Sequence, residues 1–269
     1  MEVITSKSND KVKFLKSLND KKERIKNNCF YLEGVKVVSE ILSMEKAVNI
    51  KFIAYSSTIL KGVNGGECLL SKLINFDVKI IEFSKEIFEY ICDTKTPQGI
   101  IAVIEIKEKT YNQMLENGDN ILLLDSVQDP GNVGTIIRTC DAFNIRNVIY
   151  TTGTVDIYSP KTVRSTMSAI CKVNFAKVLS NELDKFKIDS KKYGYTVIGT
   201  SLQTDNFFEG YEFENKNIIV FSNEANGISK EISSICDDLI KINMSQTAES
   251  LNVGIAAGII LHKLYSNNN

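Results

Sequence analysis

Three segments in the C-terminal half of the chain contain the side chains best suited to take part in chemistry. The first covers 122–143, where Asp129 can cap a helix and Pro130 can occupy its first turn, because that position needs no amide donor. Asn132 and Arg138 then fall on one polar stripe of this helix. An arginine has a planar fork of donors that suits a phosphate or a carboxylate. The stripe therefore predicts an anion contact, and the alternative is a salt bridge between Arg138 and a nearby acid.

The second and third segments each combine a strand end with a polar loop. In 217–229 an apolar run leads into a tight turn at 222–227, whose backbone groups can hydrogen-bond a flat heterocycle. In 239–265 a predicted strand ends at Ile242 and Met244, and a loop then leads into an apolar helix. The groups that these loops can offer to a ligand are therefore amides, hydroxyls, a glutamate and the arginine.

The composition argues against several common kinds of active site. The chain has one histidine, His262, and six cysteines without a C-x-x-C pair, so histidine triads and zinc sites lack their residues. It contains no G-x-G-x-x-G, G-x-x-x-x-G-K-[ST] or G-x-S-x-G motif, which argues against a Rossmann dehydrogenase, a P-loop NTPase and an α/β-hydrolase. We expect reduced thiols, no metal, and a site made from the three polar loops.

The elements that must hold these loops are apolar runs that alternate with helical stretches. Near-continuous Ile, Leu and Val runs are typical of strands buried on both faces, as in parallel sheets covered by helices. Such runs occur in the second half of the chain at 120–126, 146–152, 172–178, 195–201, 217–223 and 239–244. Ligands of open α/β sheets bind beyond the carboxyl ends of the strands, so we expect the three loops to meet there. The predicted fold class is α/β.

The N-terminal part of the sequence indicates a smaller α/β unit that follows a basic helix. Residues 7–26 carry apolar side chains at roughly helical spacing, namely Val12, Leu15, Leu18 and Ile25. Residues 1–26 hold eight Lys/Arg and four Asp/Glu, a net charge of +4, in a chain whose formal net charge is −1. This helix is a candidate for a phosphate contact, and a solvated helix face is the alternative.

The polar segment 106–120 is the best candidate for a linker, so we predict two domains, 1–108 and 109–269. The first ten residues lack an apolar signal core. The longest uncharged apolar run, Val253–Leu261, is too short to cross a bilayer. We therefore expect a cytoplasmic protein without a membrane partner.

At the three polar loops the sequence resembles the SpoU (TrmH) family of RNA ribose 2′-O-methyltransferases. The first family motif is similar to DPGNVG at 129–134, which leads to Arg138. The second motif resembles SNEANG at 222–227. The third resembles INM at 242–244, followed by SLNV at 250–253. All three occur in the family's order, and each lies at a predicted strand-to-helix junction.

The resemblance extends over nearly the whole chain. KTVRSTMSAI at 161–170 is similar to the stretch between the first two family motifs, and FYLEGVKVVSEIL and TPQGIIAVIEI look like a small RNA-binding domain. The resemblance implies an RNA substrate-binding domain at 1–108 and a catalytic α/β domain at 109–269 with a deep trefoil knot of the SPOUT type. It also implies a homodimer, an RNA partner and S-adenosyl-L-methionine as the cofactor.

The resemblance assigns roles to residues by their place in the motifs. Those implied in catalysis are Asn132, Arg138, Glu224, Ser250 and Asn252. Those implied in cofactor binding are Thr200, Ser222, Asn223, Glu224, Gly227, Ile242, Met244, Leu251 and Asn252. The sequence departs from the family pattern at Ser222, usually glycine, at Asn243, usually proline, and near Gln246 and Thr247, where glycine is usual. A side chain where the loop needs positive φ would strain it or crowd the adenosyl group.

The implied reaction is methyl transfer from a sulfonium to a ribose 2′-hydroxyl, which needs alignment and no metal. Because a guanidinium keeps its proton in proteins, we expect Arg138 to bind the adjacent phosphate and stabilise the developing alkoxide, while phosphate or water takes the proton. Asn132, Ser250 and Asn252 would hold the arginine and the ribose. The expected substrate is 23S ribosomal RNA. A transfer RNA ribose 2′-O-methyltransferase and a non-catalytic RNA-binding protein of the same fold are the alternatives.

Overall fold

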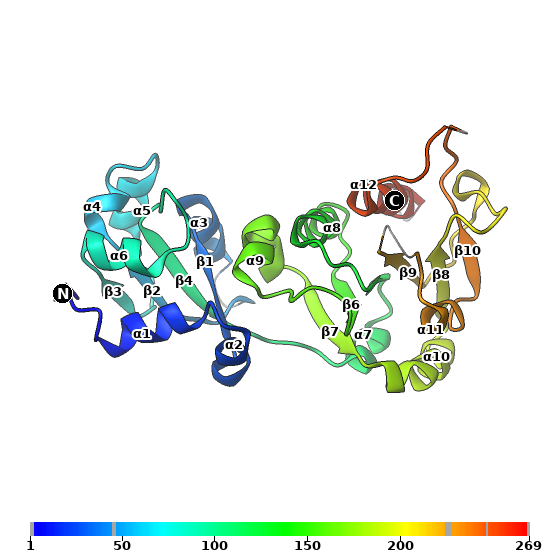
Figure 1. Cartoon of the computed structure of the whole chain (residues 1–269), viewed down its shortest axis with the longest axis horizontal. Helices are drawn as coiled ribbons and strands as arrows, with labels where there is room; N and C mark the ends of the chain where they lie inside the picture. Colours follow the sequence, from blue (N-terminus) through cyan, green and yellow to red (C-terminus); the bar gives the residue numbers. More distant parts are fainter. Residues whose placement is uncertain (1–2, 45–46, 224–226, 246, 268–269) are drawn as a thin grey trace. The chain divides into compact units, whose positions relative to one another are not determined.

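The chain packs as two compact units, which are coloured along the sequence in Figure 1. The computed structural model describes residues 3–44, 47–223, 227–245 and 247–267. One unit comprises the residues up to Ile106 together with Tyr158–Cys171, and the other comprises Lys107–Ile157 and the residues from Lys172 onward. The segment 158–171 therefore packs with the N-terminal unit, although both of its sequence neighbours belong to the other one.

The first unit is built on a four-stranded mixed sheet. Its strands, in spatial order, are β1 (Cys29–Glu33), β4 (Ile100–Glu105), β2 (Ile50–Tyr55) and β3 (Ile80–Glu82). Its helices are α1 (Asp10–Ser17), α2 (Lys21–Asn27), α3 (Val35–Ser43), α4 (Ser57–Leu60), α5 (Gly66–Leu73), α6 (Lys85–Ile91) and α9 (Pro160–Thr166). β4 runs antiparallel to β1 and β2, and β3 runs parallel to β2. A hydrophobic core joins α1 and α6 to this sheet through side chains such as Leu15, Phe52 and Phe88.

The predicted basic helix over 7–26 is wrong in one respect, because the structure has two short helices there, α1 and α2. The side chain of Asp20 accepts a hydrogen bond from the backbone amide of Lys22 and starts a new helix, which changes the helical phase. Ile25, expected on the apolar face, is therefore 68% exposed, whereas Arg24 is only 4% exposed. The Arg24 guanidinium donates to the Leu18 carbonyl at 2.7 Å. The burial predicted for Leu18 and the apolar residues of α1 is confirmed.

The second unit contains a six-stranded, fully parallel sheet. Its strands, in spatial order, are β10 (Asp238–Ile240), β8 (Thr196–Thr200), β9 (Asn217–Ser222), β5 (Ile121–Asp125), β6 (Asn147–Thr151) and β7 (Asn174–Val178). Every residue of the two central strands, β5 and β9, is buried. The predicted α/β class with a parallel sheet covered on both faces is confirmed, and the trefoil knot stays a prediction.

Helices cover both faces of this sheet, as Figure 1 shows. They are α7 (Tyr111–Asn117), α8 (Pro130–Ala142), α10 (Leu183–Lys192), α11 (Lys230–Ser233) and α12 (Val253–Asn267). α7 lies in the segment expected to be a linker, but it is anchored, because Tyr111, Met114 and Leu115 belong to the core of this unit. Among the described residues, no helix combines the length and the apolar character needed to cross a bilayer.

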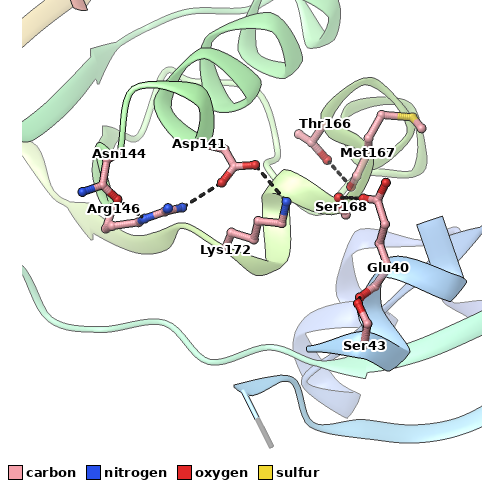
Figure 2. A network of polar contacts seen from close by, with 9 residues as sticks. All are labelled: Glu40, Ser43, Asp141, Asn144, Arg146, Thr166, Met167, Ser168 and Lys172. Carbon is pink, nitrogen blue, oxygen red and sulfur yellow. Dashed lines mark hydrogen bonds and ion pairs between the residues drawn. The ribbon is translucent and has the colours of Figure 1, made fainter. Parts of the chain in front are cut away.

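The segment 158–171 is attached to the first unit by both a polar and an aromatic contact. The Ser168 hydroxyl donates to the Glu40 carboxylate on α3, as Figure 2 shows. The rings of Tyr158 and Phe30 lie with their centroids 5.2 Å apart.

On the second unit, Asp141 forms ion pairs with Arg146 and Lys172 (Figure 2).

Candidate active site

The candidate site is a cavity of about 310 Å³ at the carboxyl ends of β8, β9 and β10. The parallel register sets this position, because Thr200 at the end of β8 pairs with Ile240 at the end of β10. At the centre of the sheet, Ser222 at the end of β9 pairs with Asp125 at the end of β5. The loops that leave these strands therefore start side by side, as the crevice rule for open α/β sheets requires.

Most residues predicted to bind a cofactor line this cavity. They are Thr200, Ser222, Asn223, Gly227, Ile242, Met244 and Leu251, and Ser250 from the predicted catalytic set joins them. Glu224 lies outside the described residues. Asn132, Arg138 and Asn252 are not among the lining residues. The structure thus brings together the strand-end loops, and a hydrogen bond links Asn132 to Asn252, directly before the α12 residues that line the cavity. Arg138 lies on α8, outside this lining.

That helical wall was missed by sequence reasoning. Val253, Ala256 and Ile260 of α12 line the cavity, and so do Leu202 and Gln203 from the loop after β8. The three α12 residues are spaced three and four apart, so they share one helical face, and this spacing is a signal that the sequence offered. The apolar wall shields one side of the cavity from water.

Asn252 and Asn132 join the third motif to the first. The Asn252 side-chain amide donates to Asn132 Oδ1 at 2.9 Å, across 120 residues of sequence. Asn252 Oδ1 accepts from the backbone amides of Gly254 at 3.0 Å and Ile255 at 3.3 Å, so it also caps α12. A Cβ at Gly254 would lie 3.0 Å from Thr135 Cγ2 on α8, so the glycine allows the two helices to approach closely.

Arg138 lies on the exposed stripe of α8 that the sequence predicted. Asp129 Oδ1 caps this helix by accepting from the Asn132 amide at 2.8 Å, and Pro130 occupies its first turn. Val133, Ile136, Ile137 and Cys140 are fully buried on the opposite face. In the parts of the chain that the structure describes, Arg138 forms no ion pair, so the alternative of a structural salt bridge finds no partner there. Its guanidinium is accessible to a ligand.

The turn after β9 is closed by its own backbone. The Gly227 amide donates to the Asn223 carbonyl at 2.9 Å, and Gly227 has φ +66°, a value that glycine adopts without strain. Ser222 is buried and has no positive φ, so the serine at this usual glycine position does not strain the backbone. Of the two effects expected from this departure, only crowding of the cavity by the hydroxymethyl group is left.

Asp125 is a buried residue at this site that sequence reasoning did not select. Its Oδ2 accepts from the Ser229 amide at 2.9 Å, where α11 begins, and its Oδ1 accepts from the Thr151 hydroxyl at 3.3 Å. These bonds fix the loop after β5 against the segment that follows the 222–227 turn. Asp125 therefore acts as a structural clamp between two of the three polar loops.

Neighbouring groups hold two polar side chains near these loops, Cys236 and Lys241. Burial, and then the Asp237 and Asp125 carboxylates, raise the pKa of the Cys236 thiol to about 12, so this thiol stays neutral. Lys241, which lines the cavity, lies over the Phe207 ring and 3.4 Å from Asp205 Oδ1. Within the described ranges, no three His, Cys, Asp or Glu side chains gather as metal ligands.

Two family models and several relatives match this chain. The SpoU rRNA methylase family model matches residues 119–262, and the MRM3-like substrate binding domain model matches residues 9–102. The 23S rRNA (guanosine(2553)-2'-O)-methyltransferase RlmP of Bacillus subtilis is 31% identical over 264 residues, which cover 98% of this chain and 99% of that protein.

Solved structures agree with these matches. The AdoMet-bound rRNA methyltransferase from Sinorhizobium meliloti superposes with a TM-score of 0.84 and 26% identity, over 99% of this chain and 98% of that one. A putative RNA methyltransferase of the TrmH family from Porphyromonas gingivalis superposes with a TM-score of 0.77 and 30% identity, over 95% and 97% of the two chains. From its strand-end cavity, its three motif loops and these matches, the chain belongs to the SpoU rRNA methylase family.

Proposed function

We propose that this protein transfers a methyl group from S-adenosylmethionine to a ribose 2′-hydroxyl of 23S ribosomal RNA. The observation that carries the proposal is the cavity bounded by the ends of β8, β9 and β10, which the second and third motif loops line. RlmP of Bacillus subtilis is named for this reaction at a guanosine of 23S rRNA, and it matches this chain over nearly its full length. The Sinorhizobium meliloti relative binds AdoMet.

The cavity suits the cofactor in size and in chemistry. Its volume of about 310 Å³ falls in the range of roughly 300–1,000 Å³ that is usual for small-molecule sites. Apolar side chains from α12 face polar strand ends across it, which matches a ligand with a flat heterocycle and a polar tail. S-adenosylmethionine supplies an activated methyl group when bound. Thr200, Ser222, Asn223, Gly227, Ile242, Met244 and Leu251 would hold it, together with Glu224 and Asn252.

In the proposed mechanism the side chains position the reacting oxygen. Arg138 keeps its positive charge, binds the phosphate beside the target ribose, and stabilises the charge that develops on the 2′-oxygen. The hydrogen bond between Asn252 and Asn132 holds the N-terminal turn of α8, from which Arg138 projects two turns later. Ser250 and Glu224 complete the proposed catalytic set, and phosphate or water accepts the proton.

The Arg138→Lys variant tests the role of the guanidinium fork. We expect kcat to fall by about 10²-fold, as when one preorganised donor is lost from a transition state, while the Kd for S-adenosylmethionine stays unchanged. Arg146→Lys is the matched control, because Arg146 forms an ion pair with Asp141 that a lysine can also form. Near-full methyl transfer by Arg138→Lys would contradict a need for the bidentate fork.

The substrate class is tested by labelling. Incubation of the protein with labelled S-adenosylmethionine and total RNA from a strain lacking it should place the label on one ribose of 23S rRNA. Label on transfer RNA would favour the first alternative. Absence of label, together with no calorimetric binding of millimolar cofactor, would favour a non-catalytic RNA-binding protein of this fold.

We further infer a homodimer formed through the outer face of α12, and a cytoplasmic location, where an rRNA substrate would be met. Ile255 is 55% exposed and Ile259 is 38% exposed, one turn apart on this face, and Tyr265 is also exposed. Exposed apolar stripes of this kind mark interaction surfaces. Sedimentation of Ile255→Glu should show a monomer. Ile188→Glu on α10 is the control, because Ile188 is as exposed, at 68%, but lies on another helix.

A further inference from the structure

A second cavity, of about 250 Å³, lies within the first unit and takes no part in the proposed methyl-transfer site. It is formed where β1 ends, where α3 begins, by the loop at 94–98 and by α9. All of its lining residues belong to the compact unit that combines the N-terminal residues with 158–171. The segment 158–171 therefore forms one wall of this cavity by packing within the first unit.

The inner wall of the cavity holds a partly buried carboxylate, Glu33. The Thr94 hydroxyl donates to Glu33 Oε1 at 2.9 Å, and the Gln98 backbone and the Cys92 thiol also hydrogen-bond this carboxylate. Three donors leave about one of the four lone-pair positions of a carboxylate for a ligand. Burial raises the pKa of Glu33, so the surrounding donors do not fully replace the water it has lost.

The rim of the cavity is positively charged. Arg164 on α9 and Lys36 on α3 both line it and both are exposed. Neither forms an ion pair with a carboxylate in the ranges that the structure describes. Arg164 lies near enough to Glu33 to favour its charged form, but no salt bridge joins them. The cations are therefore available to an anionic ligand that enters from outside.

Met167 supplies an apolar wall and is held in an unusual conformation. Its φ is +56°, in the region that side chains rarely adopt. Its neighbours fix it from both sides, because the Thr166 hydroxyl donates to the Val163 and Met167 carbonyls and Ser168 donates to Glu40 (Figure 2). Backbone strain of this kind persists where surrounding contacts enforce it, and it is concentrated at ligand sites.

We propose that this cavity receives one unstacked nucleotide of the RNA substrate, whose base donates an N–H group to Glu33 and packs on Met167, and whose phosphate lies between Arg164 and Lys36. This inference rests on the proposed function, because it takes RNA as the substrate. An acceptor on the inner wall, an apolar side and a cationic rim are the three features that recognition of a splayed-out nucleotide requires. An apolar ligand would leave the acceptor and the cationic rim without partners, and an acidic ligand would leave the acceptor without a donor.

The test measures binding of unmethylated 23S rRNA transcript in the absence of cofactor, by filter binding. We expect Arg164→Ala to raise the Kd about tenfold and to lower the salt dependence by about one phosphate contact. Glu33→Gln keeps an acceptor for Thr94 but removes the charge, and it should raise the Kd at constant salt dependence. Lys61→Gln is the matched control, since it removes one exposed cation from the same unit away from the cavity, and its Kd should stay within about twofold.

Several outcomes would overturn the proposal. One is wild-type affinity in both Arg164→Ala and Glu33→Gln, and another is an equal loss in Lys61→Gln. If Arg164→Ala does not fold, Arg164→Lys, which keeps the charge, is measured in its place. A wild-type protein that binds neither 23S rRNA nor transfer RNA also refutes it. Failure of methyl transfer alone would refute the proposed function and leave this binding result intact, because the assay contains no cofactor.

Discussion

Removal of the Asn252 side chain should destabilise helix α12, and the hydrogen bonds that are lost determine the cost in free energy. Asn252 caps the helix through the amides of Gly254 and Ile255 and donates to Asn132 Oδ1 at 2.9 Å. A lost cap costs about 1 kcal/mol, and a lost hydrogen bond costs about 1 kcal/mol. Asn252→Ala should therefore cost about 2 kcal/mol, and Asn132→Ala about 1 kcal/mol.

Hydrogen exchange of the α12 amides is the suitable assay, because it reports local opening and does not require two-state unfolding of a two-unit chain. Exchange should speed up by roughly thirtyfold in Asn252→Ala and by roughly fivefold in Asn132→Ala. Asn252→Ser keeps a capping oxygen but is too short to reach Asn132, so it should match Asn132→Ala. The double alanine variant should exchange no faster than Asn252→Ala, since both single changes remove the same bond.

Either of two results would refute this reasoning. If Asn252→Ser exchanged as fast as Asn252→Ala, the side chain would not act as a cap. If Asn132→Ala left α12 exchange unchanged, the bond between the first and third motifs would contribute nothing to helix stability. In that case the two motifs would be adjacent in space but energetically independent.

Three further predictions follow from packing and charge. Gly199→Ala should lower the free energy of unfolding by about 1–3 kcal/mol, because the added Cβ would lie 2.7 Å from the side chains of Ile228 and Leu239. An unchanged urea unfolding curve would show that the core relaxes around the methyl group. Glu33→Gln should stabilise the fold at neutral pH, because burial raises the pKa of Glu33. Its urea midpoint should exceed that of the wild type at neutral pH, and the difference should fade as the pH is lowered toward 4.5, the ordinary pKa of a glutamate. A difference in urea midpoint that does not change with pH would contradict this. Lys263→Met should lower the free energy of unfolding by about 1–3 kcal/mol, because the Lys263 ammonium donates to three carbonyl groups of a short turn. An unchanged melting temperature would show that water replaces the ammonium.

The strands and the position of the site could be predicted from the sequence because both depend on local patterns. Continuous apolar runs such as 120–126 and 217–223 indicated strands buried on both faces, and β5 and β9 are the buried centre of a parallel sheet. The polar residues directly after each run then had to meet at one edge of the sheet. Thr200 and Ser222 line the cavity for this reason.

Other features depend on contacts that no local pattern records. The helix break at Asp20 is an exception, because it is marked by a local cap, and the Arg24 guanidinium then bonds the Leu18 carbonyl six residues earlier. The bond between Asn132 and Asn252 joins residues far apart in sequence. The association of 158–171 with the first unit depends on Glu40 and Ser168, which are individually unremarkable polar residues.

If the protein dimerises through α12 as proposed, this helix brings cofactor binding and assembly under one structural control. Ala256 and Ile260 face the cavity, whereas Ile255 and Ile259 lie on the exposed face, so substitutions on one face should leave the property of the other unchanged. Asn252 is different, because it sets both where the helix begins and how it is rotated against α8. A rotation of α12 would move both faces at once. Cofactor affinity and the proposed dimerisation are therefore expected to be lost together in Asn252→Ala, beyond the loss of any contact that Asn252 itself makes with the cofactor.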